Sequence, residues 1–271
     1  MTKQTYPAQL EDKSSGGLRN ALPRRDFLRY TGAGLALTGL VLNGCSDDDD
    51  NVDPNANNTV NVGTSDIGVL NYAYALEQLE AAFYAQVIAG GTGTYFTSLG
   101  ANSAERQILT DLAAHEKAHR DFFKNTIPAN SIIKELSPDF SAIDFNVGKR
   151  AAGAPAGTKL GVLDAAMAFE DLGVAAYNGA GRYITNPVYL ALAGKIVSVE
   201  ARHAALIRDL MSYNTFVGSD VVDLFTPTGS ASTPGVGNGT GLEKSKRPAE
   251  VITTANQFLQ EGSKLNVSGL A

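Results

Sequence analysis

The sequence has a single cysteine, no tryptophan and only three histidines among its 271 residues. One cysteine excludes both an internal disulfide framework and a metal cage built from cysteines. Basic residues are also in the minority, because 22 lysines and arginines face 28 acidic residues and the net charge is −6. With a sequence pI of about 5.1, the chain lacks the positive charge that nucleic-acid binding needs, and we expect no nucleic-acid partner.

Long apolar runs are also scarce. The longest lies near the N-terminus and is too short to span a bilayer comfortably. The mean hydropathy of −0.08 fits a soluble domain. The chain length allows one or two domains with an ample hydrophobic core.

The first 44 residues are typical of an export signal rather than of a folded domain. Segment 24–29 (Arg-Arg-Asp-Phe-Leu-Arg) resembles the twin-arginine export motif. The only cysteine, Cys45, follows Leu-Asn-Gly at 42–44, which resembles a lipoprotein cleavage box. We therefore expect an exported protein, anchored to the membrane by a lipid on Cys45, in the periplasm or at the outer membrane. The alternative is that Cys45 is a free thiol near a cleavage point.

Three further segments follow the signal. Residues 45–63 contain four consecutive aspartates and many asparagines, which predicts a disordered, solvated tether. Residues 64–215 carry helical periodicity and form the expected folded domain. Residues 216–271 are read as a linker rich in Ser, Thr, Pro and Gly, followed by a helical strap.

Four long helices are predicted from apolar residues at helical spacing and from start and stop signals. Two glycines end the first helix, Pro128 ends the second, and Asn186-Pro187 begins the fourth. The expected spans are about 66–89, 103–127, 158–184 and 187–213.

The connections between these helices indicate the architecture. Residues 128–157 contain several glycines and prolines and no sustained period, so we expect a long crossover between helices 2 and 3. A short fifth helix is predicted over 248–260. Two closely connected helix pairs joined by a long crossover predict an all-α four-helix bundle.

A doubled motif connects the four predicted helices. In each half of the chain, one helix carries a Glu followed seven residues later by a Tyr, and the next helix carries Glu-x-x-His. Residues three or seven apart share one face of a helix. If the four faces meet, four carboxylates and two imidazoles converge inside the bundle. The members are Glu77 and Tyr84, Glu116 and His119, Glu170 and Tyr177, and Glu200 and His203.

The charge of this set points to metal ions. The sequence around the acids on helices 1 and 3 is apolar, and a buried, unpaired carboxylate costs several kcal/mol. Two imidazoles cannot neutralise four carboxylates, whereas two divalent metal ions supply the missing positive charge. Carboxylate and imidazole ligands together suit iron or manganese. The same ligand pattern holds two metal ions in the di-iron and di-manganese carboxylate bundles.

With this order of motifs, residues 66–213 resemble the ferritin-like domain proteins, including the desiccation-related ones, and also bacterioferritins and rubrerythrins. The resemblance implies a ferritin-like four-helix bundle. It implies that Tyr84 lies beside the site, and the repeat makes Tyr177 its counterpart. As candidate catalytic residues, these tyrosines would hydrogen-bond a ligand carboxylate or quench an oxidising equivalent; the alternative is that they are simple core aromatics. The implied metal ligands are Glu77, Glu116, His119, Glu170, Glu200 and His203.

Two neighbouring residues compete with these assignments. Glu80 lies near the same helix face as Glu77, but the repeat aligns Glu77 with Glu170 and Glu80 with Gly173. We therefore expect Glu80 at the rim, paired with a Lys or Arg. His115 lies off the ligand face, and we expect it to be solvated or to act as an outer partner of the site. Several relatives carry an acid just before each Glu-x-x-His, where this chain has His115 and Val199, so the outer contacts of the ligand histidines must differ.

The expected function follows from these features. The first hypothesis is a di-metal protein that reacts with oxygen or peroxide in envelope, desiccation or oxidative stress, with a manganese-catalase-like activity as a variant. The second is a non-enzymatic module that keeps a structural or vestigial metal site and protects surfaces or binds a partner. The sequence leaves the oligomeric state open.

Overall fold

The computed structural model describes residues 58–90, 93–223 and 241–270, all within one unit that spans 53–271. The predicted export signal, Cys45, most of the tether and most of the Gly-rich linker lie outside the described residues. Among the helices that are described, none is both long and apolar enough to cross a membrane.

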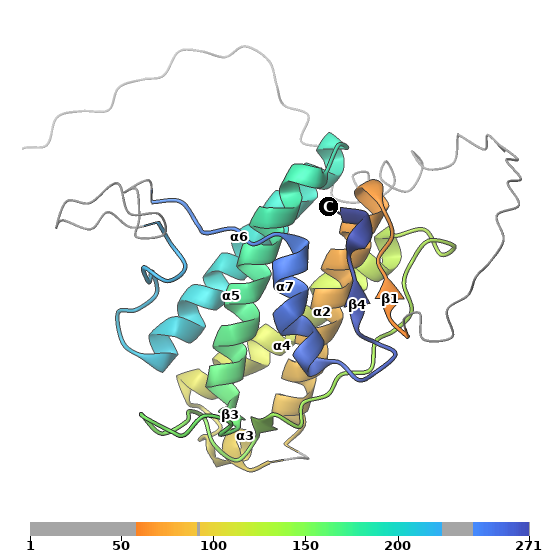
Figure 1. The fold of residues 1–271 in the computed structure, drawn as a ribbon. Coiled ribbons are helices and arrows are strands. Elements are labelled where there is room, and N and C mark those ends of the chain that lie inside the picture. Colours follow the sequence, from red (N-terminus) through yellow and green to blue (C-terminus); the bar gives the residue numbers. More distant parts are fainter. Residues whose placement is uncertain (1–57, 91–92, 224–240, 271) are drawn as a thin grey trace, which may run out of the picture. The chain divides into compact units, whose positions relative to one another are not determined.

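Four long helices form the body of this unit (Figure 1). The first, α2, packs mainly against α4, and α5 packs mainly against α6. The connection from α4 to α5 is the long crossover, so the predicted all-α architecture is confirmed. The helices are α2 (Ser65–Ala89), α4 (Ala104–Thr126), α5 (Val162–Ala180) and α6 (Pro187–Met211).

Local sequence chemistry explains most helix ends. Gly90 ends α2 in the left-handed conformation, with φ of 63°, as glycine commonly does after a helix. The Ser103 hydroxyl accepts a hydrogen bond from the Arg106 backbone N–H at the start of α4. The Asn186 side chain accepts one from the Val188 N–H, and proline follows as the first residue of α6.

The predicted third helix is shorter than expected at its start. Residues Leu160–Gly161 form strand β3, which pairs in parallel with β2 (Ile143–Asp144) in the crossover. The Asp164 side chain accepts a hydrogen bond from the Gly161 N–H, so the helix begins at Val162. At its other end a 3₁₀ turn, η1 (Gly181–Tyr183), follows α5.

The predicted tether also ends earlier than residue 63. Strand β1 (Val60–Asn61) pairs in parallel with β4 (Leu265–Asn266), and the side chains of Val60 and Val62 are buried. The prediction of a disordered tether up to residue 63 is therefore wrong for its last residues. Their partner lies about 200 residues along the chain, which is too distant for local sequence patterns to indicate.

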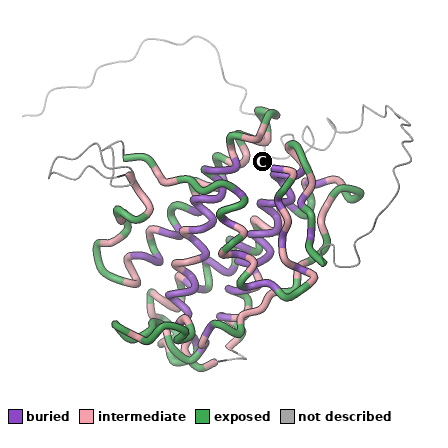
Figure 2. Tube along the Cα trace, viewed as in Figure 1, coloured by how far each residue is buried: buried purple, intermediate pink, exposed green. Residues whose placement is uncertain are grey.

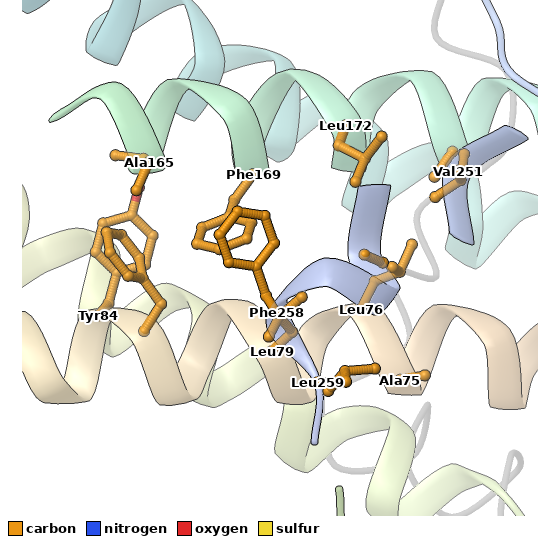
Figure 3. Packing of buried hydrophobic residues seen from close by; sticks show 14 of the residues in the cluster. Ala75, Leu76, Leu79, Tyr84, Ala165, Phe169, Leu172, Val251, Phe258 and Leu259 are labelled. Carbon is orange, nitrogen blue, oxygen red and sulfur yellow. The ribbon is translucent and has the colours of Figure 1, made fainter. Parts of the chain in front are cut away.

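The remaining elements surround the bundle. A short helix, α3 (Tyr95–Ser98), lies between α2 and α4. The predicted fifth helix is present as α7 (Pro248–Ala255), followed by the 3₁₀ turns η2 (Asn256–Phe258) and η3 (Ser268–Leu270). Figure 3 shows Phe258 beside Phe169 of α5, and their ring centroids are 4.8 Å apart.

Helix α2 contains a long buried stretch, and buried backbone runs through the helices of the bundle (Figure 2). Between Gly68 and Tyr84, every residue except Ala82 is buried. Its outer side is covered by the crossover, whose backbone is held by α2 side chains. Asn71 donates to the Ser131 carbonyl and accepts from the Ile133 N–H, and Gln78 accepts from the Leu136 N–H. Asn71 and Gln78 therefore fix the crossover rather than face solvent.

Candidate metal centre

The structure brings the six predicted ligand residues together in the middle of the bundle. They form two overlapping groups, and within each group the candidate ligand atoms lie within 4.8 Å of one another. The shared members are Glu116 and Glu200. One group adds Glu77 and His119, and the other adds Glu170 and His203.

The two shared glutamates lie between the two histidines. Glu116 presents Oε1 to His203 Nδ1 at 2.7 Å and Oε2 to His119 Nδ1 at 3.5 Å. Glu200 does the reverse, with Oε1 at 2.6 Å from His119 Nδ1 and Oε2 at 3.5 Å from His203 Nδ1. Each shared carboxylate therefore spans both halves of the cluster, as a bridging ligand would.

The other two glutamates each serve one half of the cluster. Glu77 Oε2 lies 3.5 Å from His119 Nδ1, and Glu170 Oε2 lies 3.5 Å from His203 Nδ1. The remaining oxygen of each is held by a tyrosine from the opposite half of the chain. Tyr177 donates to Glu77 Oε1 at 2.5 Å, and Tyr84 donates to Glu170 Oε1 at 2.6 Å.

These crosswise hydrogen bonds decide between two readings of the tyrosines. Tyr84 and Tyr177 are buried, but they are more than core aromatics, because each contacts a cluster carboxylate directly. Burial raises the pKa of both hydroxyls well above the usual range, so each stays protonated and donates its hydrogen bond. The tyrosines thereby turn the free oxygens of Glu77 and Glu170 toward the centre.

The cluster is nearly sealed from solvent. All four carboxylates have 0% exposure, and His203 has 4%. The His119 side chain is the most exposed of the six, at 14%. In this environment an uncompensated charge is costly, so the cluster needs either protons or cations to balance it.

The way in which the polar atoms of the cluster converge favours a bound cation over protons. Eight oxygen and nitrogen atoms of the cluster are buried without a hydrogen-bond partner, among them both Nδ1 atoms and both oxygens of Glu116 and of Glu200. The imidazole nitrogens lie close to the carboxylates, but these contacts lack the direction of a hydrogen bond. Buried polar atoms that converge in this way without partners require an explanation. A cation between them provides one, and the carboxylate and imidazole donors fit iron or manganese.

Protonation is the alternative way to balance these charges. Burial raises the pKa of Glu77 well above its usual range and that of Glu170 to about 8. For Glu116 burial acts in the same direction, but the close imidazoles outweigh it and lower the pKa to about 2. Burial would lower the pKa of His119 and His203, yet the surrounding carboxylates raise each to about 12. Without metal, the cluster therefore holds several protons at neutral pH.

Glu80 is placed differently from the prediction. It is buried, with 4% exposure, and its carboxylate lies against Gly173 of α5, where an added Cβ would come within 3.0 Å of Oε1. Burial raises its pKa, and the acidic residues Glu200 and Glu116 raise it further. The expectation of a rim position beside a Lys or Arg is therefore wrong. The missing side chain at Gly173 provides the space that Glu80 occupies.

His115 proves to be an outer partner of the cluster. Its Nδ1 lies 2.9 Å from His203 Nε2, and the two rings stack with centroids 5.2 Å apart. His115 itself is exposed, so it links the inner imidazole to the surface. In the other half of the chain the corresponding residue is Val199, which has no hydrogen-bonding side chain. The two halves therefore differ in the support given to their histidines.

Comparison with known proteins agrees with this geometry. The family model described as the ferritin-like domain matches residues 65–213, a range that contains the four long helices and all six cluster residues. No curated protein sequence matches the chain. The matched range covers more than half of the chain. We conclude that this protein belongs to the ferritin-like domain family.

Proposed function

We propose that the cluster binds two divalent metal ions, iron or manganese, and that the loaded protein reacts with oxygen or peroxide. The observation that carries this proposal is the pair of overlapping ligand groups sharing Glu116 and Glu200. One ion would be held by Glu77 and His119, and the other by Glu170 and His203. The two shared glutamates would bridge them.

The metals and the protein would have separate tasks. When bound, two such ions would supply Lewis acidity and the electrons that reduce oxygen or peroxide. The protein fixes the ligands and excludes bulk water. Tyr84 and Tyr177 orient Glu170 and Glu77 through their hydrogen bonds, and they are the oxidisable side chains in contact with the cluster.

The cellular setting is also part of the proposal. The twin-arginine-like segment 24–29 and Cys45 support export and a lipid anchor, in the periplasm or at the outer membrane, with a role in envelope, desiccation or oxidative stress. Twin-arginine export passes folded proteins, which suits a metal loaded in the cytoplasm. Cys45→Ser should release the exported protein from the membrane fraction, and retention of this variant in that fraction would contradict a lipid anchor.

Metal loading followed by an activity assay tests the central proposal. The purified full chain is loaded anaerobically with ferrous or manganous ions, desalted and analysed for metal. We expect about two ions per chain, as in other di-metal carboxylate bundles. Less than about 0.3 ion per chain would contradict the site, given that structural ligand sets of this kind bind tightly. Oxygen and peroxide consumption is then compared with that of the same amount of free metal.

A second function is favoured by one observation, the complete burial of the four carboxylates. A sealed site suits a structural metal in a non-enzymatic, protective module. The same assay distinguishes the two functions. Full metal loading without oxygen or peroxide turnover above that of free metal favours the structural role. Turnover of peroxide by the manganese-loaded protein favours a manganese-catalase-like activity.

The asymmetry at His115 gives a prediction about the two ions. His115→Ala removes the contact to His203 Nε2, and loss of such an outer partner commonly weakens metal binding by about 10–100-fold. We expect only the ion beside His203 to weaken, so that titration with a competing chelator resolves one unchanged and one weaker site. Val199→Ala, at the corresponding position, is the control and should change neither. Equal weakening of both ions by His115→Ala would contradict the assignment.

The shifted pKa values predict that metal binding releases protons. Metal ligands must be deprotonated. At pH 7 the metal-free cluster holds protons on His119 and His203, with pKa about 12, and largely on Glu170, with pKa about 8. Glu77 adds a further proton, because burial raises its pKa well above the usual range. Metal therefore competes with at least three protons, and its affinity should rise as the pH is raised from about 6 to 8. Calorimetry in two buffers of different ionisation enthalpy measures the number released. An affinity independent of pH over this range would contradict the prediction.

A further inference from the structure

An apolar cavity lies at one end of the bundle, between all four long helices. Its walls include Ala73 and Leu76 of α2, Phe123 of α4, Tyr177 of α5 and Ala193 of α6. The space open to the centre of a water-sized molecule is about 20 Å³. This is only slightly more than the roughly 10–15 Å³ that a single water molecule requires. The cavity therefore fits a very small molecule and excludes an organic substrate.

The cavity adjoins the metal centre. Ala73 precedes Glu77 by four residues, and Phe123 follows His119 by four residues, so each lies one helical turn from a cluster residue. Tyr177 connects the two directly, because it lines the cavity and donates to Glu77. A molecule in the cavity would therefore be next to the half of the cluster that contains Glu77 and His119.

The internal repeat shows how the opposite end of the bundle is filled. The positions corresponding to Ala73, Phe123 and Ala193 are Ala166, Ile207 and Leu109, and each of these three has 0% exposure. Among these three pairs only Ala193 is smaller than its counterpart, Leu109. A fourth lining residue, Ala176, corresponds to the larger Phe83, which also has 0% exposure. Ala193 is only partly buried, packed beside the core residues of that end. The small residues at 176 and 193 therefore account for much of the open space.

The walls select an apolar occupant. The hydroxyl of Tyr72, a lining residue, is buried without a hydrogen-bond partner, while the Thr126 and Tyr177 hydroxyls at the cavity already donate within the protein. The other lining side chains are apolar apart from Tyr189. Small apolar cavities stay dry and take up apolar molecules or xenon rather than water. Peroxide would lose most of its hydrogen bonds on entering.

We propose that this cavity holds dioxygen beside the metal centre and that dioxygen, rather than peroxide, is the oxidant this fold selects. The inference rests on the proposed reactivity of the centre and specifies its substrate. Because the four carboxylates are fully buried, any reactant must reach them through the protein interior. The cavity provides a place for a small apolar reactant in contact with Tyr177, which holds Glu77.

Xenon tests the cavity independently of any metal chemistry. Crystals of the full chain under xenon pressure should show xenon bounded by Ala73, Phe123 and Ala193. Ala193→Leu introduces the residue of the opposite end and should abolish xenon binding. Ala193→Val is a milder variant that should reduce it if the leucine variant fails to fold. Gly194→Ala is the matched control, because its added Cβ meets nothing within 4 Å. No xenon in the unsubstituted protein, or equal xenon in a folded Ala193→Leu variant, overturns the proposal.

The reaction of the iron-loaded protein tests the assignment of dioxygen. In Ala193→Leu, with metal content unchanged, the oxygen reaction measured by stopped flow should slow by roughly tenfold. This corresponds to a barrier that is higher by about 1.4 kcal/mol. The rate of the peroxide reaction in Ala193→Leu should equal the rate in the control variant Gly194→Ala. An oxygen rate unaffected by Ala193→Leu overturns the assignment. Xenon binding without any oxygen consumption by the unsubstituted protein contradicts the proposed reaction and leaves the gas cavity supported.

Discussion

Replacing Glu116 with glutamine should abolish binding of both metal ions, although the side chain keeps its shape. Glu116 presents one oxygen to each half of the cluster, with Oε1 near His203 and Oε2 near His119. In Glu116→Gln an amide nitrogen replaces one of these oxygens and the negative charge is lost. We expect the metal content after loading and desalting to fall from about two ions per chain to nearly none, because both ions lose a bridging ligand.

Two matched variants make this result specific. Glu77→Gln removes a carboxylate that faces only His119, so it should leave about one ion bound, the one beside His203 and Glu170. Asp111→Asn makes the corresponding change at an exposed position of the same helix and should leave the metal content unchanged. If Glu116→Gln retains one full ion while Glu77→Gln loses both, the assignment of bridging and terminal ligands is wrong.

Removing the metals should lower the Tm by roughly 10–20 °C at neutral pH. A ligand present at about 100 times its Kd stabilises the folded state by about 2.7 kcal/mol. Two sites therefore contribute about 5 kcal/mol, and each kcal/mol shifts the Tm of a domain of this size by about 2–4 °C. The physical source would be the cluster itself, where the cations would satisfy buried oxygens and nitrogens that have no hydrogen-bond partner.

Thermal unfolding of the loaded protein with and without a chelator measures this effect. The difference should shrink as the pH is lowered, because metal binding displaces protons from His119, His203 and Glu170, and a higher proton concentration therefore weakens it. Glu116→Gln provides the control, since its Tm should not respond to the chelator. A chelator effect of the same size in Glu116→Gln would place the stabilising metal elsewhere in the protein.

The features that the sequence predicted well depend on local patterns. The ends of α2, α4 and α6 follow from Gly90, Ser103 and Asn186, which act on their own helix. The cluster follows from spacing within each helix, because Glu-x-x-His places both side chains on one face. The repeat selected Glu77 as the counterpart of Glu170, and the structure places each of them in one of the two groups.

The features that were missed depend on contacts between distant segments. Helix α5 begins late because Leu160 pairs with Ile143, and Val60 is ordered by pairing with Leu265. Glu80 is buried because Gly173 on another helix leaves space for it. The repeat aligns Glu80 with Gly173, and this alignment predicts a position outside the core for Glu80. The glycine in fact leaves space in the core for the Glu80 side chain.

The two halves of the centre differ in the outer contact of their histidines, and the sequence showed this only as a departure from the pattern of the relatives. His115 and Val199 broke the expected pattern, but spacing within α4 does not show that His115 reaches across to His203. The cavity likewise depends on side-chain volume. Ala193 and Leu109 occupy equivalent positions of the repeat, but Leu109 is fully buried in the core, whereas Ala193 lines the cavity. Both features arise from packing between helices, which the pattern of a single helix does not determine.

Anomalous diffraction from crystals of the metal-loaded full chain tests the central claim most directly. Data collected on either side of the iron or manganese absorption edge locate each ion and identify it. The account predicts two peaks, one beside His119 and Glu77 and one beside His203 and Glu170, with Glu116 and Glu200 contacting both. A loaded crystal with no peak among these six residues, or with a single peak that Glu116 and Glu200 do not share, would contradict it.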